Sequence, residues 1–453
     1  MVKYRLIMSQ YKRLLKIAIP IAIQQVIFSS ANFIDTLMIG QLGEASIASV
    51  GLSGQFFFVY NLIIFGLVSG GSIFIAQFWG QKEMNNISKT TAFMTMVSLA
   101  LSSVFFLMAA FFPEFTMRLF SPDPEVIRLG AGYMEITSFT YLTFAITMVM
   151  SFTLRNTEHT TIPMLVSMVS MGANTFLNWI FIFGQFGLEP MGVNGAALGT
   201  LISRIIEVIM FIIIINAKKL PGRFNLDHIR MLNKKFILRF IKYALPTVGN
   251  ELFWSLGVTM YTIIYSYIGT NVIAANRIMG SIENFTFSIL FALSSGAAVL
   301  IGQELGKSNF EMARKISRMC IKLVVVLAIG IGIFVIGFSE IFLSLFNVLP
   351  EVRELARIIL ILAMSFLPFK ILNGLFIAGV LRAGGDTRFA FMAEVGCLWG
   401  IGVPLIFIAG MVLKLPYPIV YSLTMAEELI KLTILIKRYR TGKWLNNVID
   451  TLH

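Results

Sequence analysis

The chain has 453 residues, of which 57% are hydrophobic and only 13% are charged. Soluble domains carry about 25% charged residues, so this composition excludes an ordinary soluble protein and indicates a polytopic membrane protein. The net charge of +13 would also suit a nucleic-acid-binding protein, but we attribute it to basic membrane loops and expect no nucleic-acid partner. The few charges lie between apolar runs long enough for helical spans, which need about 20 residues. We therefore predict an all-α fold.

Twelve apolar runs are candidates for transmembrane helices. Lys and Arg gather in the N-terminal segment, in the loops after the sixth and eighth spans, and in the C-terminal segment. The positive-inside rule therefore predicts that both termini are cytoplasmic, in the inner (plasma) membrane. As an alternative, these basic segments could contact anionic lipid head groups. The predicted spans are 14–39, 46–78, 90–112, 126–152, 162–184, 194–216, 237–266, 272–304, 317–346, 353–380, 388–411 and 416–436.

The sequence repeats itself with an offset of 226 residues. Pro20 then falls on Pro246, and Gln77 on Gln303, while Leu154-Arg155 matches Leu381-Arg382 one residue further on. The repeat predicts two six-helix lobes, 1–216 and 237–453, joined by a basic cytoplasmic linker at 217–236. Because six is even, the repeat is parallel, with its pseudo-twofold axis along the membrane normal. We expect a central cleft between the lobes, where secondary transporters bind and rock.

Asp35 is the first candidate for a functional residue. It lies in the apolar run Ile17–Gly43, where a charged group costs about 2.5–3.5 kcal/mol or more, so it is retained only with a function or a partner. One interpretation is an acid that reaches the interface or forms a structural hydrogen bond. The other is a site for a cation such as Na⁺, or for a proton, because a carboxyl group in an apolar environment can exchange a proton near neutral pH.

The fifth and sixth predicted spans offer neutral oxygen atoms for such a site. Asn174 and Asn178 are four residues apart and therefore share one helix face, and Thr200 follows in the next span. A single Asn in a span often only joins helices. A pair beside an intramembrane Asp favours a cation- or proton-binding role, with a possible Na⁺ at Asp35, Asn174 and Asn178.

The seventh and eighth spans carry two further acids. Glu251 lies five residues after Pro246, and we expect it to contact substrate or to form a second coupling site. Its repeat mate by the 226-residue offset is Gln25, whereas Asp35 aligns with Tyr261, so the two lobes do not place their acids alike. Glu283 is a weaker candidate, for which a structural pairing is equally plausible.

Several other polar residues receive predictions of their own. Gln24 and Gln25 complete the predicted substrate or second coupling site. Local ion pairs account for Glu207 with Arg204 and for Glu427 with Lys431, whereas no account is found for Glu394. We interpret Arg155 and Arg382 as residues of lobe stabilisation or gating.

Pro20 and Pro246 occupy matching positions in the first helix of each lobe. A proline inside a helix kinks or breaks it, whereas a proline in the first turn does not. We predict a conformational role, with a first-turn proline as the alternative.

Other kinds of chemistry find no support in the sequence. Cys320 and Cys397 lie in apolar runs and are predicted to be buried and unpaired. The three histidines, His159, His228 and His453, have no metal-ligand spacing. There is no phosphate-binding loop, nucleophile elbow or HExxH motif. We therefore predict neither an enzyme nor a cofactor.

The pattern resembles the multidrug and toxic compound extrusion (MATE) family over essentially the whole chain. The resemblance is carried by the twelve spans in two lobes, by Pro20 followed by Gln24-Gln25, by Asp35-Thr36, by Glu251 after Pro246, and by LRAGGDTR at 381–388. It implies export of amphipathic cations driven by inward Na⁺ or H⁺. It also implies an N-lobe cation site at Asp35, Asn174, Asn178 and Thr200, as in NorM-like members, and a C-lobe acid at Glu251. The tenth span lacks the acid that NorM-type members tend to carry there, which weakens the case for a second cation site.

Together these features predict a secondary active multidrug or organic-cation efflux antiporter that works as a monomer by alternating access between the lobes. The 25 Met and 41 Phe residues suit walls that repack around varied apolar ligands. The alternative is a flippase for a lipid-linked saccharide precursor, which has a related architecture. A flippase would favour a basic cleft for pyrophosphate, whereas the intramembrane charges here are mainly acidic, with Lys370 the main exception.

Overall fold

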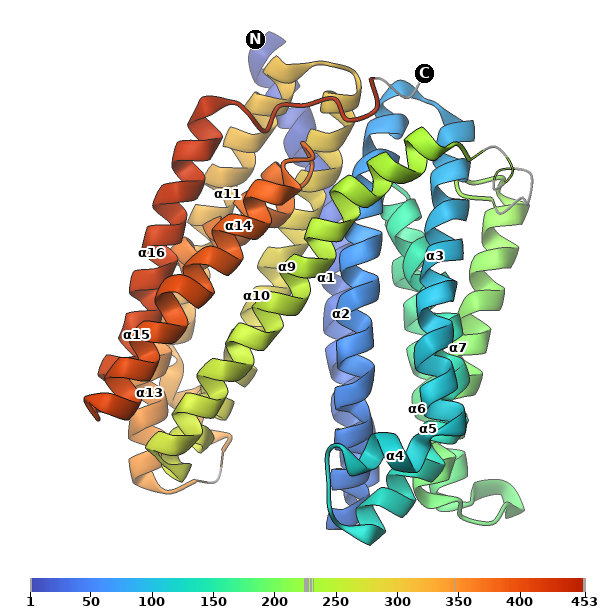
Figure 1. The fold of residues 1–453 in the computed structure, drawn as a ribbon, viewed down its shortest axis with the longest axis vertical. Helices are drawn as coiled ribbons and strands as arrows, with labels where there is room; N and C mark the ends of the chain where they lie inside the picture. Colours follow the sequence, from blue (N-terminus) through green and yellow to red (C-terminus); the bar gives the residue numbers. More distant parts are fainter. Residues whose placement is uncertain (1, 224–227, 229, 231, 347, 451–453) are drawn as a thin grey trace. The chain divides into compact units, whose positions relative to one another are not determined.

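The structure, a computed structural model, describes residues 2–223, 228, 230, 232–346 and 348–450, with side chains from residue 8 onward. His453 and part of the predicted linker, residues 224–227, 229 and 231, lie outside the described residues. Regular structure within the described ranges is helical (Figure 1), which confirms the predicted fold class.

Long helices account for all twelve predicted spans. Ten of them, among the described residues, are long and apolar enough to cross a membrane; α9 and α16 fall short because they carry more polar and charged residues. The helices in chain order are α1 (Val2–Gly40), α2 (Glu44–Gln81), α3 (Met84–Phe111), α5 (Pro124–Asn156), α6 (Thr161–Phe183), α7 (Gly192–Ala217), α9 (Lys234–Ile268), α10 (Thr270–Gly306), α11 (Phe310–Gly337), α13 (Pro350–Gly374), α14 (Thr387–Cys397), α15 (Val403–Phe407) and α16 (Tyr417–Thr441).

Short elements and π-helical turns complete this series. The tenth span continues from α13 into the π turn η2, and the eleventh runs from α14 through η3 and α15 to η4. The short elements are α4 (Pro113–Arg118), η1 (Gln185–Gly187), η2 (Leu375–Leu381), α12 (Ser339–Ser344), η3 (Leu398–Gly402) and η4 (Ile408–Val412).

The structure corrects two expectations about helix ends. The ninth span was predicted to run over 317–346, but α11 ends at Gly337 and the short α12 follows it. The alternative of first-turn prolines is wrong, because Pro20 and Pro246 both lie inside their helices. Each therefore removes a backbone hydrogen bond from the helix interior.

The chain forms two compact units. The N-unit is Ile23–Ala244, and the C-unit is Leu245–His453 together with Met1–Ala22. The divisions fall within α1 and α9, at positions that differ from the predicted lobe boundary at 217–236. The division of the sequence into lobes 1–216 and 237–453 remains a prediction that rests on the repeat.

Three connecting turns are duplicated between the units. Lys82 after α2 and Ser308 after α10 both have a positive φ, of 62° and 57°. Glu158 and Gly385, which follow α5 and η2, also both have a positive φ. The backbone hydrogen bonds after these residues match as well: His159 N donates to Leu154 O at 2.8 Å, and Asp386 N donates to Leu381 O at 2.9 Å. Gly43 and Gly269 precede α2 and α10 in the same way.

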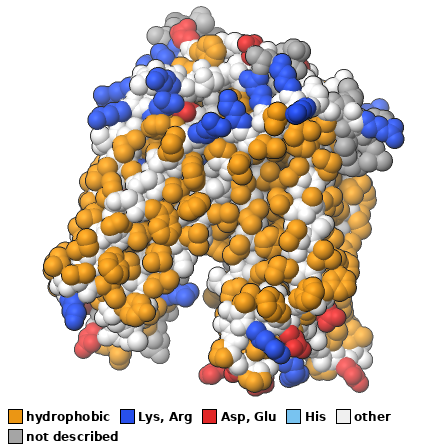
Figure 2. All heavy atoms as spheres, viewed as in Figure 1, with side chains coloured by type: hydrophobic (Ala, Val, Ile, Leu, Met, Phe, Trp, Pro, Cys, Tyr) orange, Lys and Arg blue, Asp and Glu red, His pale blue; other side chains and the backbone are white. Residues whose placement is uncertain are grey.

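A few long helices make most of the packing contacts within each unit. In the N-unit, α5 packs against α2, α3 and α7, and α6 packs closely against α7. In the C-unit, α10 and α13 pack against each other and both pack against α11. On the face shown in Figure 2, hydrophobic side chains cover the middle of each unit, as expected for a surface in contact with lipid.

Candidate functional site

Asp35 of α1 is held by an asparagine of α6. Asn178 Nδ2 donates a hydrogen bond of 2.9 Å to Asp35 Oδ1. Asn174 lies one turn away; with its amide rotated by half a turn, its nitrogen would donate to Asp35 Oδ2 at 3.0 Å. Because an amide carries a donor and an acceptor at opposite corners, the Asn174 side chain can turn either atom toward Asp35.

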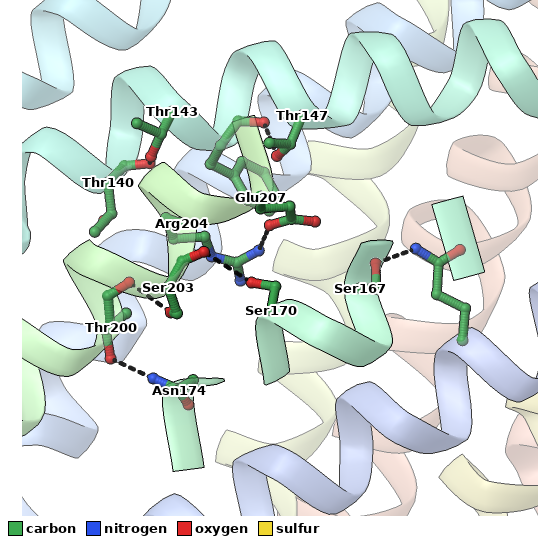
Figure 3. Close-up of polar contacts among 12 residues, drawn as sticks. Thr140, Thr143, Thr147, Ser167, Ser170, Asn174, Thr200, Ser203, Arg204 and Glu207 are labelled. Carbon is green, nitrogen blue, oxygen red and sulfur yellow. Dashed lines mark hydrogen bonds and ion pairs between the residues drawn. The ribbon is translucent and has the colours of Figure 1, made fainter. Parts of the chain in front are cut away.

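The hydroxyl of Thr200 joins this group from α7. In the orientation drawn in Figure 3, Asn174 Nδ2 donates to Thr200 Oγ1 at 3.3 Å. Asn174 and Asn178 are 4% and 1% exposed, and the amide oxygen of Asn178 has no hydrogen-bond partner. An unpaired buried acceptor is costly, and this oxygen faces Gly199 of α7 while the amide nitrogen faces Asp35. The structure thus brings together the four residues predicted from sequence.

Close packing of α6 on α7 fixes the position of Asn178. A Cβ atom added at Gly199 would lie 2.1 Å from Asn178 Oδ1, and one added at Gly195 would lie 2.5 Å from the backbone of Phe181. Only glycine therefore allows the two helices to approach this closely.

Arg204 lies one turn beyond Thr200 and was predicted only as the partner of Glu207. The predicted ion pair is present, with Arg204 Nη1 2.7 Å from Glu207 Oε2, and both side chains are largely buried (Figure 3). Arg204 also interacts electrostatically with Asp35. The N-unit therefore contains a permanent positive charge close to its acid. Counting helical turns from Thr200 could have found this relationship, because residues 200 and 204 share one helix face.

A row of polar groups leads from this site along α6. Ser167, Ser170, Asn174 and Asn178 are spaced by three or four residues and are all buried. Ser170 donates to the backbone oxygen of Ser203 at 2.9 Å. At the other end of the row, Gln24 of α1 donates to Ser167 Oγ at 2.6 Å.

Each unit has an arginine that contacts a polar side chain about one helical turn after the proline. Arg155 Nη2 donates to Gln24 Oε1 at 2.7 Å in the N-unit, and Arg382 Nη2 donates to Glu251 Oε1 at 2.9 Å in the C-unit. Both pairs are separated by 131 residues. By contact, then, the counterpart of Glu251 is Gln24, although the 226-residue offset aligns Glu251 with Gln25. Gln24 lies four residues after Pro20 and Glu251 five residues after Pro246, so the two arginines reach side chains at neighbouring positions of the repeat.

The remaining predicted acid is also paired. Glu283 of α10 lies 2.5 Å from Lys370 of α13, and both side chains are mostly buried. Neither Glu251 nor Glu283 is therefore an uncompensated carboxylate in this structure. Cys320 and Cys397 are buried and free, as predicted.

Two repeats of six membrane helices with buried polar groups define the class of this protein as a polytopic membrane transporter. The family model MatE matches two segments, 20–180 and 246–408, which begin at the two repeat prolines. The chain belongs to this family, as the resemblance predicted.

Curated relatives are similar over nearly the whole chain. The uncharacterized transporter YisQ of Bacillus subtilis (strain 168) is 26% identical over 94% of this chain and 93% of its own length. The probable multidrug resistance protein NorM of Thermotoga maritima is 25% identical over 97% of this chain and 94% of its own.

Solved structures have the same fold. A MOP superfamily transporter from Pyrococcus furiosus has a TM-score of 0.86 at 18% identity, over 96% of both chains. A MATE transporter in complex with MaL6 has a TM-score of 0.87 at 18% identity, over 96% of this chain and 97% of the other.

Proposed function

We propose that this protein is a multidrug efflux transporter that exchanges amphipathic cationic compounds for an inward-moving Na⁺ or H⁺. The multidrug resistance role given to the NorM relatives supports export of drugs. The observation that carries the coupling proposal is the group formed by Asp35, Asn174, Asn178 and Thr200.

The four residues suit a small cation. A carboxylate, amide oxygens and a hydroxyl are hard oxygen ligands. Asn178 now turns its amide nitrogen toward Asp35, so its amide must rotate to offer its oxygen to a cation. Protonation of Asp35 would serve the same purpose, because it removes the negative charge from the interior of the membrane. Both readings make Asp35 the residue whose charge changes during the cycle.

Coupling requires that ion and drug bind differently to the outward-open and inward-open states. Occupation of Asp35 would favour one of these states, and binding of the drug would favour the other. Pro20 and Pro246 are proposed to permit the bending of α1 and α9 in this change, since each interrupts the hydrogen bonding of its helix.

Substrate contacts are proposed at Gln24, Gln25, Glu251 and Glu283. Three of them have protein partners in this structure: Gln24 with Arg155, Glu251 with Arg382 and Glu283 with Lys370. A cationic substrate that binds either glutamate must therefore compete with a basic side chain, so binding would be coupled to opening of the ion pair.

The protein is proposed to act as a monomer in the plasma membrane, with both termini in the cytoplasm. Its lipid-facing surface is apolar, with exposed residues such as Phe33, Leu107 and Val326. The proposal excludes enzymatic activity and a nucleic-acid partner.

The test is efflux of a cationic dye from proteoliposomes under an imposed Na⁺ gradient or an imposed pH gradient. Wild type is compared with Asp35→Asn, which keeps the size of the side chain but removes its charge. We expect the wild type to respond to one gradient, and Asp35→Asn to lose at least about 90% of that response, because removal of a coupling group costs more than one factor of ten. The gradient that drives efflux identifies the ion.

Glu114→Gln is the matched control, since Glu114 is exposed and pairs only with Arg118 on the surface. It should transport like the wild type. Full gradient-driven efflux by a folded Asp35→Asn protein would refute the role of Asp35. Absence of dye movement in the wild type under either gradient would favour a lipid-linked saccharide as cargo.

A further inference from the structure

A cluster of four charged residues lies inside the C-unit. Lys431 of α16 is 3% exposed and contacts three carboxylates: Glu394 of α14 at 2.9 Å, Glu427 at 2.9 Å and Glu428 at 3.2 Å. The side chains of these glutamates are only 2% to 15% exposed. The sequence predicted the pair of Glu427 and Lys431 and left Glu394 without a partner.

The charges of this cluster do not balance. Lys370 and Glu283 form a neutral pair next to it, and Lys370 also interacts with Glu428. Glu251, which interacts with Glu394, is neutralised by Arg382. Among the described residues that face Lys431, this leaves three carboxylates against one ammonium group. Uncompensated charge inside a membrane-spanning bundle is strongly unfavourable, so the cluster requires additional positive charge.

Two polar side chains beside the cluster each have an oxygen atom without a hydrogen-bond partner. Asn373 of α13 is 2% exposed and donates to Glu428 Oε2 at 2.6 Å, while its own amide oxygen has no partner. The hydroxyl of Tyr261 is buried without a partner and lies beside Gly402, where an added Cβ would be 1.9 Å from the hydroxyl and 3.1 Å from Glu427 Cγ. A protonated Glu428 carboxyl could donate to the Asn373 amide oxygen if the amide rotated, at the cost of the 2.8 Å hydrogen bond that Asn373 Nδ2 donates to the backbone oxygen of Glu428.

The internal repeat places this cluster at positions equivalent to those of the candidate site around Thr200 and Arg204 in the N-unit. The offset of 227 residues that relates Arg155 to Arg382 also relates Arg204 to Lys431 and Thr200 to Glu427. A buried basic residue therefore follows one turn after Thr200 on α7 and one turn after Glu427 on α16. The position of the acid differs between the units. The N-unit has Asp35 on α1, where the C-unit has Tyr261, and the C-unit has Glu427 on α16, where the N-unit has Thr200 on α7.

We propose that the carboxyl groups around Lys431 form a second, exchangeable proton site, centred on Glu427 and Glu428. Lys431 is its fixed counter-charge, and Asn373 receives the hydrogen bond of the protonated carboxyl. The role of this site in transport rests on the proposed cation-coupled function, whereas proton binding itself does not.

The geometry favours a proton over a larger ligand. The ammonium group of Lys431 occupies the centre of the three carboxylates and would repel Na⁺ at that point. Glu427 has a side chain only 2% exposed, which leaves no surface for an organic cation. A proton needs neither an open path for a large ligand nor a cage of oxygen atoms.

The test is infrared difference spectroscopy of the purified full chain in lipid nanodiscs, recorded between acidic and alkaline pH in Na⁺-free buffer. The C=O band of a protonated carboxylic acid should appear on acidification. We expect Asp35→Asn to retain a titrating band, whereas Glu427→Gln and Glu428→Gln should each lower its intensity by about half or shift its pH midpoint by at least one unit. Lys431→Met should move the midpoint to higher pH, because it removes the counter-charge.

Glu311→Gln is the matched control, since Glu311 is exposed and pairs with Lys315 on the surface of the C-unit; it should leave the band unchanged. A band unaffected by Glu427→Gln, Glu428→Gln and Lys431→Met would overturn the proposal. Loss of the wild-type band on adding Na⁺ at constant pH would overturn it in favour of a sodium site. Failure of dye efflux would refute the proposed function without altering this spectroscopic result.

Discussion

At the scale of single residues, partners determine which buried polar groups the membrane tolerates. Asp35 is accommodated by the hydrogen bond from Asn178 and by the electrostatic interaction with Arg204, and Glu251 is accommodated by Arg382. The positions of these groups depend on small neighbours as well as on charges. Gly199 allows Asn178 to reach Asp35 because no Cβ atom occupies the space between α6 and α7.

Gly199→Ala should disrupt the ion site without changing a ligand. The added Cβ would lie 2.1 Å from Asn178 Oδ1, so α7 must move or Asn178 must leave Asp35. Overpacking of this kind costs about 1–3 kcal/mol. Gradient-driven dye efflux should fall at least tenfold. Gly172→Ala in the same helix as Asn178 faces open space and should have little effect; equal activities of the two variants would contradict the expectation.

Glu251→Ala should destabilise the C-unit more than Glu251→Gln. Removal of one partner from a buried ion pair leaves Arg382 uncompensated and costs about 3–5 kcal/mol. Glutamine keeps an acceptor for Arg382, as Gln24 does for Arg155. Thermal unfolding of the detergent-solubilised protein, followed by size-exclusion chromatography, measures the difference. If Glu251→Ala were as stable as Glu251→Gln, the ion pair of Glu251 with Arg382 would make no contribution to the stability of the protein.

At the scale of elements, the prolines mark where α1 and α9 change partners. The N-unit begins three residues after Pro20, and the C-unit resumes one residue before Pro246. The backbone of each helix is thus continuous, but one part of the helix packs within the N-unit and the other part within the C-unit. A missing hydrogen bond at the division lowers the cost of bending there.

Pro246→Ala should slow transport while leaving the fold intact or more stable. An interior proline costs a helix about 3 kcal/mol, so alanine removes a weak point from α9. We expect efflux to fall several-fold and the unfolding temperature to stay equal or rise. Pro124→Ala is the control, because Pro124 occupies the first turn of α5, where proline is tolerated. Wild-type efflux by Pro246→Ala would argue against bending of α9 in the cycle.

At the scale of the whole molecule, the same helical arrangement occurs twice, but the buried charged residues differ between the two copies. The turns that follow α2 and α10 have the same backbone hydrogen bonds, and the family model matches both halves. The N-unit has buried or half-buried acids on α1 and α7, whereas the C-unit has them on α9, α10, α14 and α16. Shared backbone geometry therefore does not require the same arrangement of acids.

The predicted membrane topology can be tested with introduced cysteines. Lys443→Cys follows α16, and Leu188→Cys lies between α6 and α7; both positions are exposed. A membrane-impermeant thiol reagent should label Leu188→Cys in intact cells, and Lys443→Cys only after lysis. Cys320 and Cys397 are buried and should not react in the wild type. Labelling of Lys443→Cys in intact cells would reverse the predicted orientation.

The sequence was enough to predict twelve helices, because each span is a long apolar run with charged ends. It also predicted the ion pairs of Glu207 with Arg204 and of Glu427 with Lys431, since residues three or four apart on a helix are neighbours. It misjudged the end of α11 at Gly337, because the apolar run continues through the helix break. It aligned Glu251 with Gln25, whereas Arg155, the counterpart of Arg382, contacts Gln24, because a sequence offset does not show which side chain on a helix the arginine reaches.

The amino-acid sequence by itself determined the membrane class, the helix count, the repeat and the family, because hydropathy and periodicity are local properties of the chain. Only the tertiary structure decided which polar groups meet. Glu394 and Lys431 are 37 residues apart, and Asp35 and Asn178 are 143 apart. Such contacts depend on how closely helices pack and on which faces they turn toward each other. The sequence could therefore name Asp35, but it could not show that Lys431 stands among three acids.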